Sequence, residues 1–170
     1  MLKNSWKIAT IVLGVIFISA ICYGVYTFSS GKVSKNSLNI KAALVYSFGG
    51  AQPIARTKFY ILNADLNVIA QKADIDVRKT PLSLAITADE LQARITNKPS
   101  RFMEAMKPYI VKTITTDFDG KAVFEDVPTG NYFLYGRAQT RSGWAIWSLS
   151  INTQGTQTIL LDQNNAIIAD

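Results

Sequence analysis

Apolar and polar residues alternate along the second half of the chain with the period of two that is typical of β-strands. The alternation is clearest in 115–136, where one predicted face is apolar. The apolar residues on that face are Ala122, Phe124, Tyr132 and Leu134. Turn sequences separate the runs, and Gly120 and Gly130 stand where such turns require a positive φ. We therefore predict short strands at 122–125 and 131–137, joined by tight turns.

Further strands follow from the same pattern at 39–48, 55–62, 144–151 and 156–161. The strands at 131–137 and 144–151 carry apolar residues on both faces, whereas a free-standing sandwich leaves its outer face polar. Either another part of the chain or a partner protein must therefore cover that outer face. A tail at 163–170 carries a small apolar group that could dock on the domain or on a neighbour. The side chains expected in the core of the fold are Phe124, Val127, Tyr132, Leu134 and Trp147.

The N-terminus shows a different pattern, because residues 8–28 form an apolar run without a charge. A helix of this length is about 31 Å long and matches the apolar core of a bilayer. Two lysines precede the run, so the positive-inside rule favours a cytoplasmic segment at 1–7. We expect a single-pass transmembrane helix in the inner (cytoplasmic) membrane of a bacterium. A polar linker at 29–38 would then connect it to a folded domain at 39–162 on the periplasmic side.

Two alternatives to an uncleaved anchor stay open. Ile18, Ser19 and Ala20 form a passable cleavage site for a signal peptide, although the apolar run continues well past it. Cys22 could carry a lipid, although lipidation sites usually have a small residue immediately before the cysteine and this chain has the bulky Ile21 there. We retain the uncleaved anchor as the prediction.

Between 63 and 108 the chain leaves the strand pattern and predicts helices. The run TADE at 87–90 is a capping box, the signal of a helix N-terminus. Apolar residues recur around it at helical spacing, at Leu84, Ala88, Leu91 and Ile95. A second short helix is predicted to begin at Ser100 and to stop at Pro108, and 65–73 predicts a further turn or two. These helices either cover one face of the sheet or form a surface for a partner.

Two stretches of the chain resemble the carboxypeptidase-regulatory-like, or prealbumin-like (transthyretin-like), sandwich family. In the first, a glycine turn is followed by the step Pro-Ile-Ala at 53–55, between two predicted strands. The second resembles the most recognisable run of the family at Thr116, Asp117, Gly120, Ala122, Phe124, Val127, Gly130, Tyr132 and Leu134. The resemblance covers about 39–62 and 111–161. It implies a mainly β, Ig-like or prealbumin-like antiparallel β-sandwich with a helical insertion at 63–108, and it is nearly silent on function.

The composition argues against catalysis. The chain has no histidine, so the commonest general base and neutral metal ligand is missing, and its single cysteine, Cys22, rules out an intrachain disulfide. Asp117 and Asp119 resemble a fragment of a calcium loop, but Lys121 would stand at a ligand position and repel the cation. We expect a protein that is not an enzyme and that uses no cofactor or metal ion.

The charge and the anchor together suggest a role at a membrane. The net charge of +6 is small and dispersed, so we expect no contact with nucleic acid. We expect an accessory or scaffold subunit of a larger membrane protein complex, for example a respiratory or photosynthetic assembly, that contacts the bilayer through 8–28 and other membrane protein subunits through its domain. The alternative is an envelope-anchored module that binds a glycan or peptide. The candidate partner surface comprises Phe133, Tyr135, Trp144, Ile146, Phe102, Met103, Met106, Arg137 and Arg141.

Overall fold

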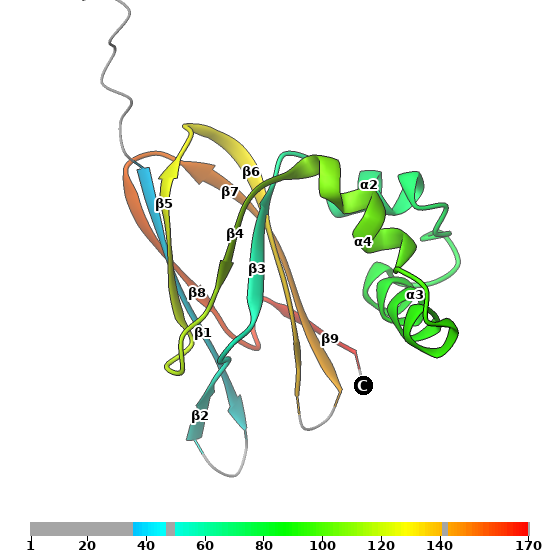
Figure 1. Ribbon diagram of the computed structural model, residues 1–170. Helices are drawn as coiled ribbons and strands as arrows, with labels where there is room; N and C mark the ends of the chain where they lie inside the picture. The colour runs from blue at the N-terminus through cyan, green and yellow to red at the C-terminus, as the bar shows by residue number, and fades with distance from the viewer. Residues whose placement is uncertain (1–35, 47–49, 141–142, 170) are drawn as a thin grey trace, which may run out of the picture. The chain divides into compact units, whose positions relative to one another are not determined.

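The computed structural model describes residues 36–46, 50–140 and 143–169, and two β-sheets form the body of this part of the chain (Figure 1). The first sheet contains β1 (Asn36–Tyr46), β2 (Gly50–Pro53), β5 (Lys121–Val127) and β8 (Thr156–Leu161). The second has the spatial order β4 (Ile110–Thr115), β3 (Lys58–Leu62), β6 (Gly130–Gln139), β7 (Trp144–Thr153) and β9 (Ala166–Ala169). This layout confirms the predicted mainly β class and is that of a β-sandwich.

The predicted membrane span at 8–28 lies outside the described residues. Within the described ranges, none of the helices is both long enough and apolar enough to cross a bilayer.

The main core lies between the two sheets and is built from alternate residues of their strands, as the period of two requires. Its members with 2% exposure or less include Leu38, Ile40, Phe59, Ile61, Phe124, Val127, Leu134 and Trp147. The rings of Phe59 and Trp147 pack with their centroids 5.8 Å apart. Among the residues predicted for the core, Phe124, Val127, Leu134 and Trp147 are buried here, and Tyr132 packs half-buried at its margin.

Two glycines allow a close approach in this core. A Cβ atom on Gly120 would lie 2.2 Å from the carbonyl oxygen of Ala42, and the φ of Gly120 is +72°. A Cβ atom on Gly136 would lie 2.1 Å from the ring of Phe59. The predicted positive φ is therefore present at Gly120 but absent at Gly130, because β6 begins at Gly130 with an extended backbone paired to β7.

The first sheet differs from the prediction in two boundaries and one direction. β1 begins at Asn36, inside the predicted linker, because Leu38 is buried in the core and the Asn36 side chain donates a hydrogen bond to Val127 (3.1 Å). The predicted turn at 49–53 contributes β2, which pairs with the end of β1 as a hairpin. β1 and β8 run parallel, so the sandwich is not wholly antiparallel.

The second sheet takes up part of the predicted tail. β9 (Ala166–Ala169) pairs antiparallel with 144–147 at the start of β7 and forms one edge of the sheet. The folded domain therefore extends beyond the predicted boundary at 162. Backbone hydrogen bonds to a neighbouring strand explain why this short apolar segment docks on its own domain.

The insertion forms a helical layer on the outer face of the second sheet (Figure 1). It consists of α2 (Leu66–Lys72), α3 (Leu82–Thr96), α4 (Arg101–Met106) and the short 3-10 helix η1 (Lys107–Tyr109). A second apolar cluster joins the helices to the sheet through Leu62, Leu66, Ile69, Ile86, Phe102, Met106, Tyr135 and Ile146. The helical layer itself thus covers the outer apolar face of these strands.

The longest helix begins earlier than its sequence signal indicates. α3 starts at Leu82, and Thr87 of the predicted capping box lies inside the helix, where its hydroxyl donates to the carbonyl oxygen of Ser83 (2.8 Å). The predicted apolar stripe faces solvent, with Leu84, Leu91 and Ile95 exposed by 42%, 57% and 72%. The stripe is exposed because α3 packs instead through its opposite side, which includes Ile86 and Asp89.

Candidate ligand-binding cleft

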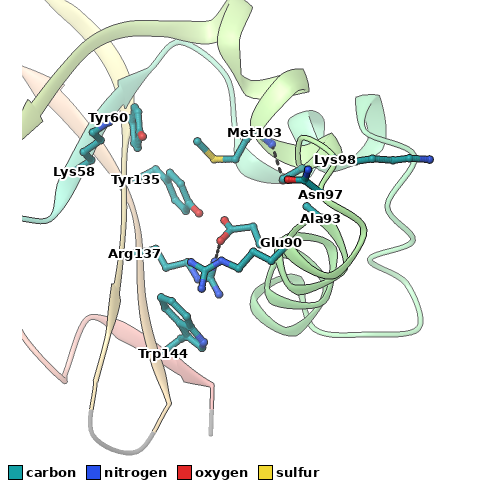
Figure 2. A pocket seen from close by; sticks show the side chains of 12 residues that line it. Lys58, Tyr60, Glu90, Ala93, Asn97, Lys98, Met103, Tyr135, Arg137 and Trp144 are labelled. Atoms are coloured by element: carbon teal, nitrogen blue, oxygen red, sulfur yellow. Dashed lines mark hydrogen bonds and ion pairs between the residues drawn. The ribbon is translucent and has the colours of Figure 1, made fainter.

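A cleft of about 520 Å³ lies between the second sheet and the helical layer (Figure 2). The sheet contributes Lys58 and Tyr60 from β3, Tyr135 and Arg137 from β6, and Trp144 from β7. The helical layer contributes Glu90, Ala93 and Arg94 from α3, Met103 from α4, and Asn97, Lys98 and Ser100 from the turn between them. The volume falls within the range of about 300–1,000 Å³ that is common for small-molecule sites.

The sheet side of the cleft is an ordered row of side chains. Tyr60 and Tyr135 are directly opposed on neighbouring strands, and their rings stack with centroids 6.0 Å apart. Arg137 lies two residues beyond Tyr135, on the same face of β6. Trp144 is its diagonal neighbour, because Arg137 pairs across the ladder with Ile146. Strand alternation therefore places these two tyrosines, the arginine and the tryptophan along one line (Figure 2).

Arg137 is a buried cation with one spare donor. Its side chain is only 8% exposed and forms an ion pair with Glu90 on α3. Its guanidinium carbon lies 3.7 Å from the ring centroid of Trp144, a cation–π contact. Burial lowers the pKa of Arg137 to about 10, so the group stays protonated at neutral pH. Its Nε–H finds no hydrogen-bond partner among the described residues.

The hydroxyl of Tyr135 is a second buried polar group that lacks a partner. The residue is 2% exposed, its ring packs in a T-shaped arrangement with Phe102 at a centroid distance of 5.8 Å, and no described residue hydrogen-bonds the hydroxyl. Burial, with a smaller effect from Tyr60, raises the pKa of Tyr135, so the hydroxyl keeps its proton and can donate. Buried polar groups in folded proteins are almost always paired. Two unpaired groups along one wall therefore identify the cleft as a place with unused hydrogen-bonding capacity.

The turn between α3 and α4 fixes the helical side of the cleft. Asn97 ends α3 in the left-handed conformation, and Ser100 caps α4 by accepting from the Met103 N–H (3.1 Å). Asp89 accepts from the Ser100 hydroxyl (2.8 Å), the Phe102 N–H (3.1 Å) and the guanidinium of the following arginine. Asp89 thus stabilises the start of α4, the helix that follows its own. The sequence had instead placed Asp89 in a capping box at the start of its own helix.

These contacts also set the ionisation of Asp89. Burial alone would raise the pKa of this carboxyl. The hydrogen bonds from the Phe102 N–H, the Ser100 hydroxyl and the Arg101 guanidinium outweigh burial, and the net result is a lowered pKa. Asp89 is therefore a charged, buried anchor for the turn that carries Asn97 and Ser100 into the cleft.

No family model matches the chain. No curated protein matches it either. Solved structures that are similar include a protein from Pseudomonas aeruginosa that is proposed to bind carbohydrate, at 17% identity and a TM-score of 0.44, covering 80% of this chain and 94% of that one. A minor pilin of Streptococcus agalactiae is 14% identical with a TM-score of 0.39, covering 76% of this chain and 44% of the pilin. A shaft pilin of Lactobacillus rhamnosus is 12% identical with a TM-score of 0.36, covering 75% and 48%.

At these identities and TM-scores the likenesses carry no functional conclusion for this chain. Membership of the carboxypeptidase-regulatory-like family stays a prediction.

The cleft brings together part of the surface that the sequence predicted for a partner. Tyr135, Arg137, Trp144 and Met103 line it. Arg141 lies outside the described residues.

The remaining residues of the predicted partner surface differ from the prediction. Phe102, Met106 and Ile146 are buried to 1% exposure or less, and Phe133 packs half-buried against them. The physical reason is that the insertion folds back onto this face, so these apolar side chains contact one another and offer little surface to a partner.

Several residues of the cleft were not predicted, namely Lys58, Tyr60, Glu90, Arg94, Asn97 and Lys98. Glu90 was assigned to a capping box, and Tyr60 was one residue of an ordinary strand. One signal could have found the ion pair, because Arg137 is a charge on a strand whose two faces are otherwise apolar. A charge in that position needs a buried counter-charge.

The fragment that resembles a calcium loop is a turn. The Asp117 carboxylate accepts from the N–H groups of Asp119 (2.9 Å) and Lys121 (2.8 Å). In the parts of the chain that the structure describes, no three histidine, cysteine or acidic side chains converge in a way that could hold a metal ion.

Proposed function

We propose that this chain is a non-catalytic binding module that holds a glycan in the cleft between the second sheet and the helical layer. One observation supports this most strongly: Tyr135 and Arg137 line the cleft, and the Tyr135 hydroxyl and the Arg137 Nε–H have no partner among the described residues. A buried polar group without a partner costs about 1–3 kcal/mol, so it is most easily understood where a ligand completes it. Tyr60 and Trp144 add half-buried rings at either end of the row.

The combination of rings and donors suits a sugar. Aromatic side chains with a polar group nearby offer both an apolar surface for the C–H face of a sugar ring and hydrogen bonds for its hydroxyls. A peptide more often binds by adding a strand to a sheet edge. The cleft lies on the face of the second sheet, where the backbone groups of β3 and β6 already pair within the sheet.

The lining also favours binding without cleavage. Glycoside hydrolysis typically needs two carboxyl groups on either side of the bond. Glu90 is the single acidic side chain that lines the cleft within the described residues, and it is paired with Arg137. The proposed module therefore holds its ligand and leaves it unchanged.

A glycan panel tests this function. The full chain in detergent is titrated with neutral and acidic oligosaccharides of bacterial envelopes, and binding is measured by calorimetry. We expect Trp144→Ala to weaken binding by tenfold or more, because it removes a ring of the cleft. Phe118→Ala is the matched control, since Phe118 is an aromatic side chain that is 71% exposed and does not line the cleft. Binding to no glycan of the panel, or to peptides only, would show that the proposal is wrong.

The exposed stripe of α3 favours a second function, attachment to a membrane protein. Residues 29–35 separate the predicted span from β1 and reach at most about 25 Å when fully extended. If residues 8–28 span the inner membrane with the domain in the periplasm, the domain stays near the bilayer. The occupant that we propose for Leu84, Leu91 and Ile95 is therefore an apolar helix of a neighbouring membrane subunit.

Native mass measurement after gentle detergent extraction tests this attachment. Leu91→Glu should release the chain from its complex, whereas Trp144→Ala should leave the complex intact because it alters a different surface. A monomeric mass for the unaltered chain would contradict the attachment to a membrane subunit and would not bear on glycan binding in the cleft.

A further inference from the structure

The charges around the cleft are strongly unequal. Lys58, Arg94, Lys98 and Arg137 line it, against the single carboxylate of Glu90. Arg137 and Glu90 pair with one another, and the three remaining cations are exposed at the rim. A neutral sugar makes no use of such a field, whereas an anion is attracted and concentrated by it.

The deepest cation is also oriented in advance. A guanidinium carries five N–H donors in a rigid plane and pairs best with a carboxylate through two of them. Contact with the Trp144 ring holds the plane of Arg137, and Glu90 fixes it from the helical side. The Nε–H is left free, and Tyr135 on the same strand face supplies a second free donor. Fixed donors with no acceptor among the described residues suit an incoming oxyanion.

We infer that the cleft selects acidic glycans, with Arg137 and Tyr135 holding a ring carboxylate and Glu90 acting as the internal anion that this carboxylate must compete with. This inference rests on the proposed glycan-binding function and names the class of ligand. The rim cations Lys58, Arg94 and Lys98 contribute attraction at longer range.

In the unliganded protein, Glu90 compensates the buried charge of Arg137. An arginine that is 8% exposed would be an uncompensated buried charge if it had no partner, and Glu90 supplies the compensation. The side chain of Glu90 is itself 18% exposed and lines the cleft, so it borders the space that a ligand would enter. A second carboxylate on Arg137 would feel repulsion from Glu90. Neutralising Glu90 should therefore strengthen the binding of an acidic ligand relative to that of a neutral one.

The test compares oligosaccharides that differ only in charge. Tetramers of galacturonate, glucuronate and mannuronate are each paired with their methyl esters, which keep the ring and remove the negative charge. The full chain in detergent should prefer at least one acid to its ester by tenfold or more, and the preference should shrink as salt is raised. Acetate tests whether the cleft recognises the sugar as well as the charge, because a small carboxylate without a sugar ring should bind far more weakly than the tetramer.

Three variants assign the preference to the cleft. Glu90→Gln should strengthen binding of the acid severalfold relative to its ester, because it removes the competing anion. The double variant Arg137→Gln with Glu90→Gln removes both charges of the pair, so that neither is left alone, and it should abolish the preference. Glu125→Gln is the control for the charge change of Glu90→Gln, because Glu125 is exposed on β5 in the other sheet. Circular dichroism confirms that each variant is folded.

The outcomes distinguish a failure of this inference from a failure of the proposed glycan-binding function. If acid and ester bind equally, the inference is wrong and the glycan-binding function stands. If neither binds but neutral glycans of the panel do, selectivity for acids is again wrong. If no glycan binds, both proposals fail. Acetate binding as tightly as the tetramer, or a preference that survives in the double variant, would also overturn the inference.

Discussion

The two faces of the second sheet differ in how completely their buried polar groups are hydrogen-bonded. Toward the first sheet, Phe59, Leu134 and Trp147 are fully buried, and the N–H of Trp147 donates to the carbonyl oxygen of Asp162 (3.1 Å). Toward the helices, Tyr135 and Arg137 are nearly as buried, but each keeps a polar atom without a partner. Burial alone does not set Tyr135 and Arg137 apart from the core residues. Their unsatisfied polar atoms do, and both lie on the face that we propose binds a ligand.

The contrast arises from neighbouring residues of one strand. In β6, Leu134 and Gly136 face the core, while Tyr135 and Arg137 face the cleft. Substitutions on the core face should therefore change the free energy of unfolding and leave ligand selectivity alone. Substitutions on the cleft face should do the reverse.

The largest effect is expected in the main core. Phe124→Ala should lower the free energy of unfolding by about 3–5 kcal/mol, because it removes a ring that is 2% exposed and leaves a cavity. Urea unfolding followed by circular dichroism measures the loss. Phe118→Ala is the control, since its ring is 71% exposed and should change the same quantity by less than about 0.5 kcal/mol. A small loss for Phe124→Ala would place this ring outside the cooperative core.

The main core is also the part that the sequence predicts best, for a physical reason. Alternation in β5, β6 and β7 is a local pattern, and each strand needs only its own residues to show which face is apolar. Phe124 and Trp147 could therefore be predicted without knowledge of their neighbours. The boundaries at β2 and β9 were missed because these four-residue strands depend on a partner strand for their hydrogen bonds.

The cleft face depends on contacts that are distant in sequence. Glu90 lies in the insertion and Arg137 in the sandwich, and no local pattern connects them. Asp89 shows the same limit, because its local sequence is that of a helix start while its hydrogen bonds go to the next helix. The sheet side of the cleft was thus predictable as a doubly apolar face, and Arg137 on it indicates a buried counter-charge, but the sequence does not show that Glu90 supplies it.

The second prediction tests the anchor of the cleft turn. Asp89→Asn should cost about 1.5–3 kcal/mol near neutral pH, because three donors lose a charged acceptor. The pKa of folded Asp89 is lowered, so its stabilising contribution is complete above the unfolded value of about 3.9 and is lost as the pH falls through the lower folded value. The difference between the two proteins should therefore shrink below about pH 4.

Urea unfolding of both proteins at pH 7 and pH 3 measures this difference. An equal gap at the two pH values would mean that the charge of Asp89 contributes nothing and that only its shape matters.

The third prediction adds one methyl group to the core face. Gly136→Ala should cost about 1–3 kcal/mol, because its Cβ would lie 2.1 Å from the ring of Phe59 and the ring must move. Gly155→Ala is a useful comparison. Gly155 has nothing within 4 Å of its added Cβ but has a φ of +67°, so it isolates backbone strain from crowding. Thermal unfolding of both variants compares the two effects, and an unchanged melting temperature for Gly136→Ala would show that the Phe59 ring moves freely.

The smallest effect on stability is expected one residue away, on the cleft face. Tyr135→Phe removes only a hydroxyl that is buried without a partner, so the free energy of unfolding should stay the same or rise by about 1 kcal/mol. The same change should weaken an acidic glycan severalfold, because it deletes one of the two free donors. Urea unfolding and calorimetry on the same sample measure both quantities, and Tyr132→Phe on the opposite face of β6 should alter neither the binding nor the preference for acids. A loss of stability in Tyr135→Phe without a loss of binding would mean that the hydroxyl stabilises the domain and does not bind a ligand. The proposed difference between the two faces of β6 would then be wrong at Tyr135.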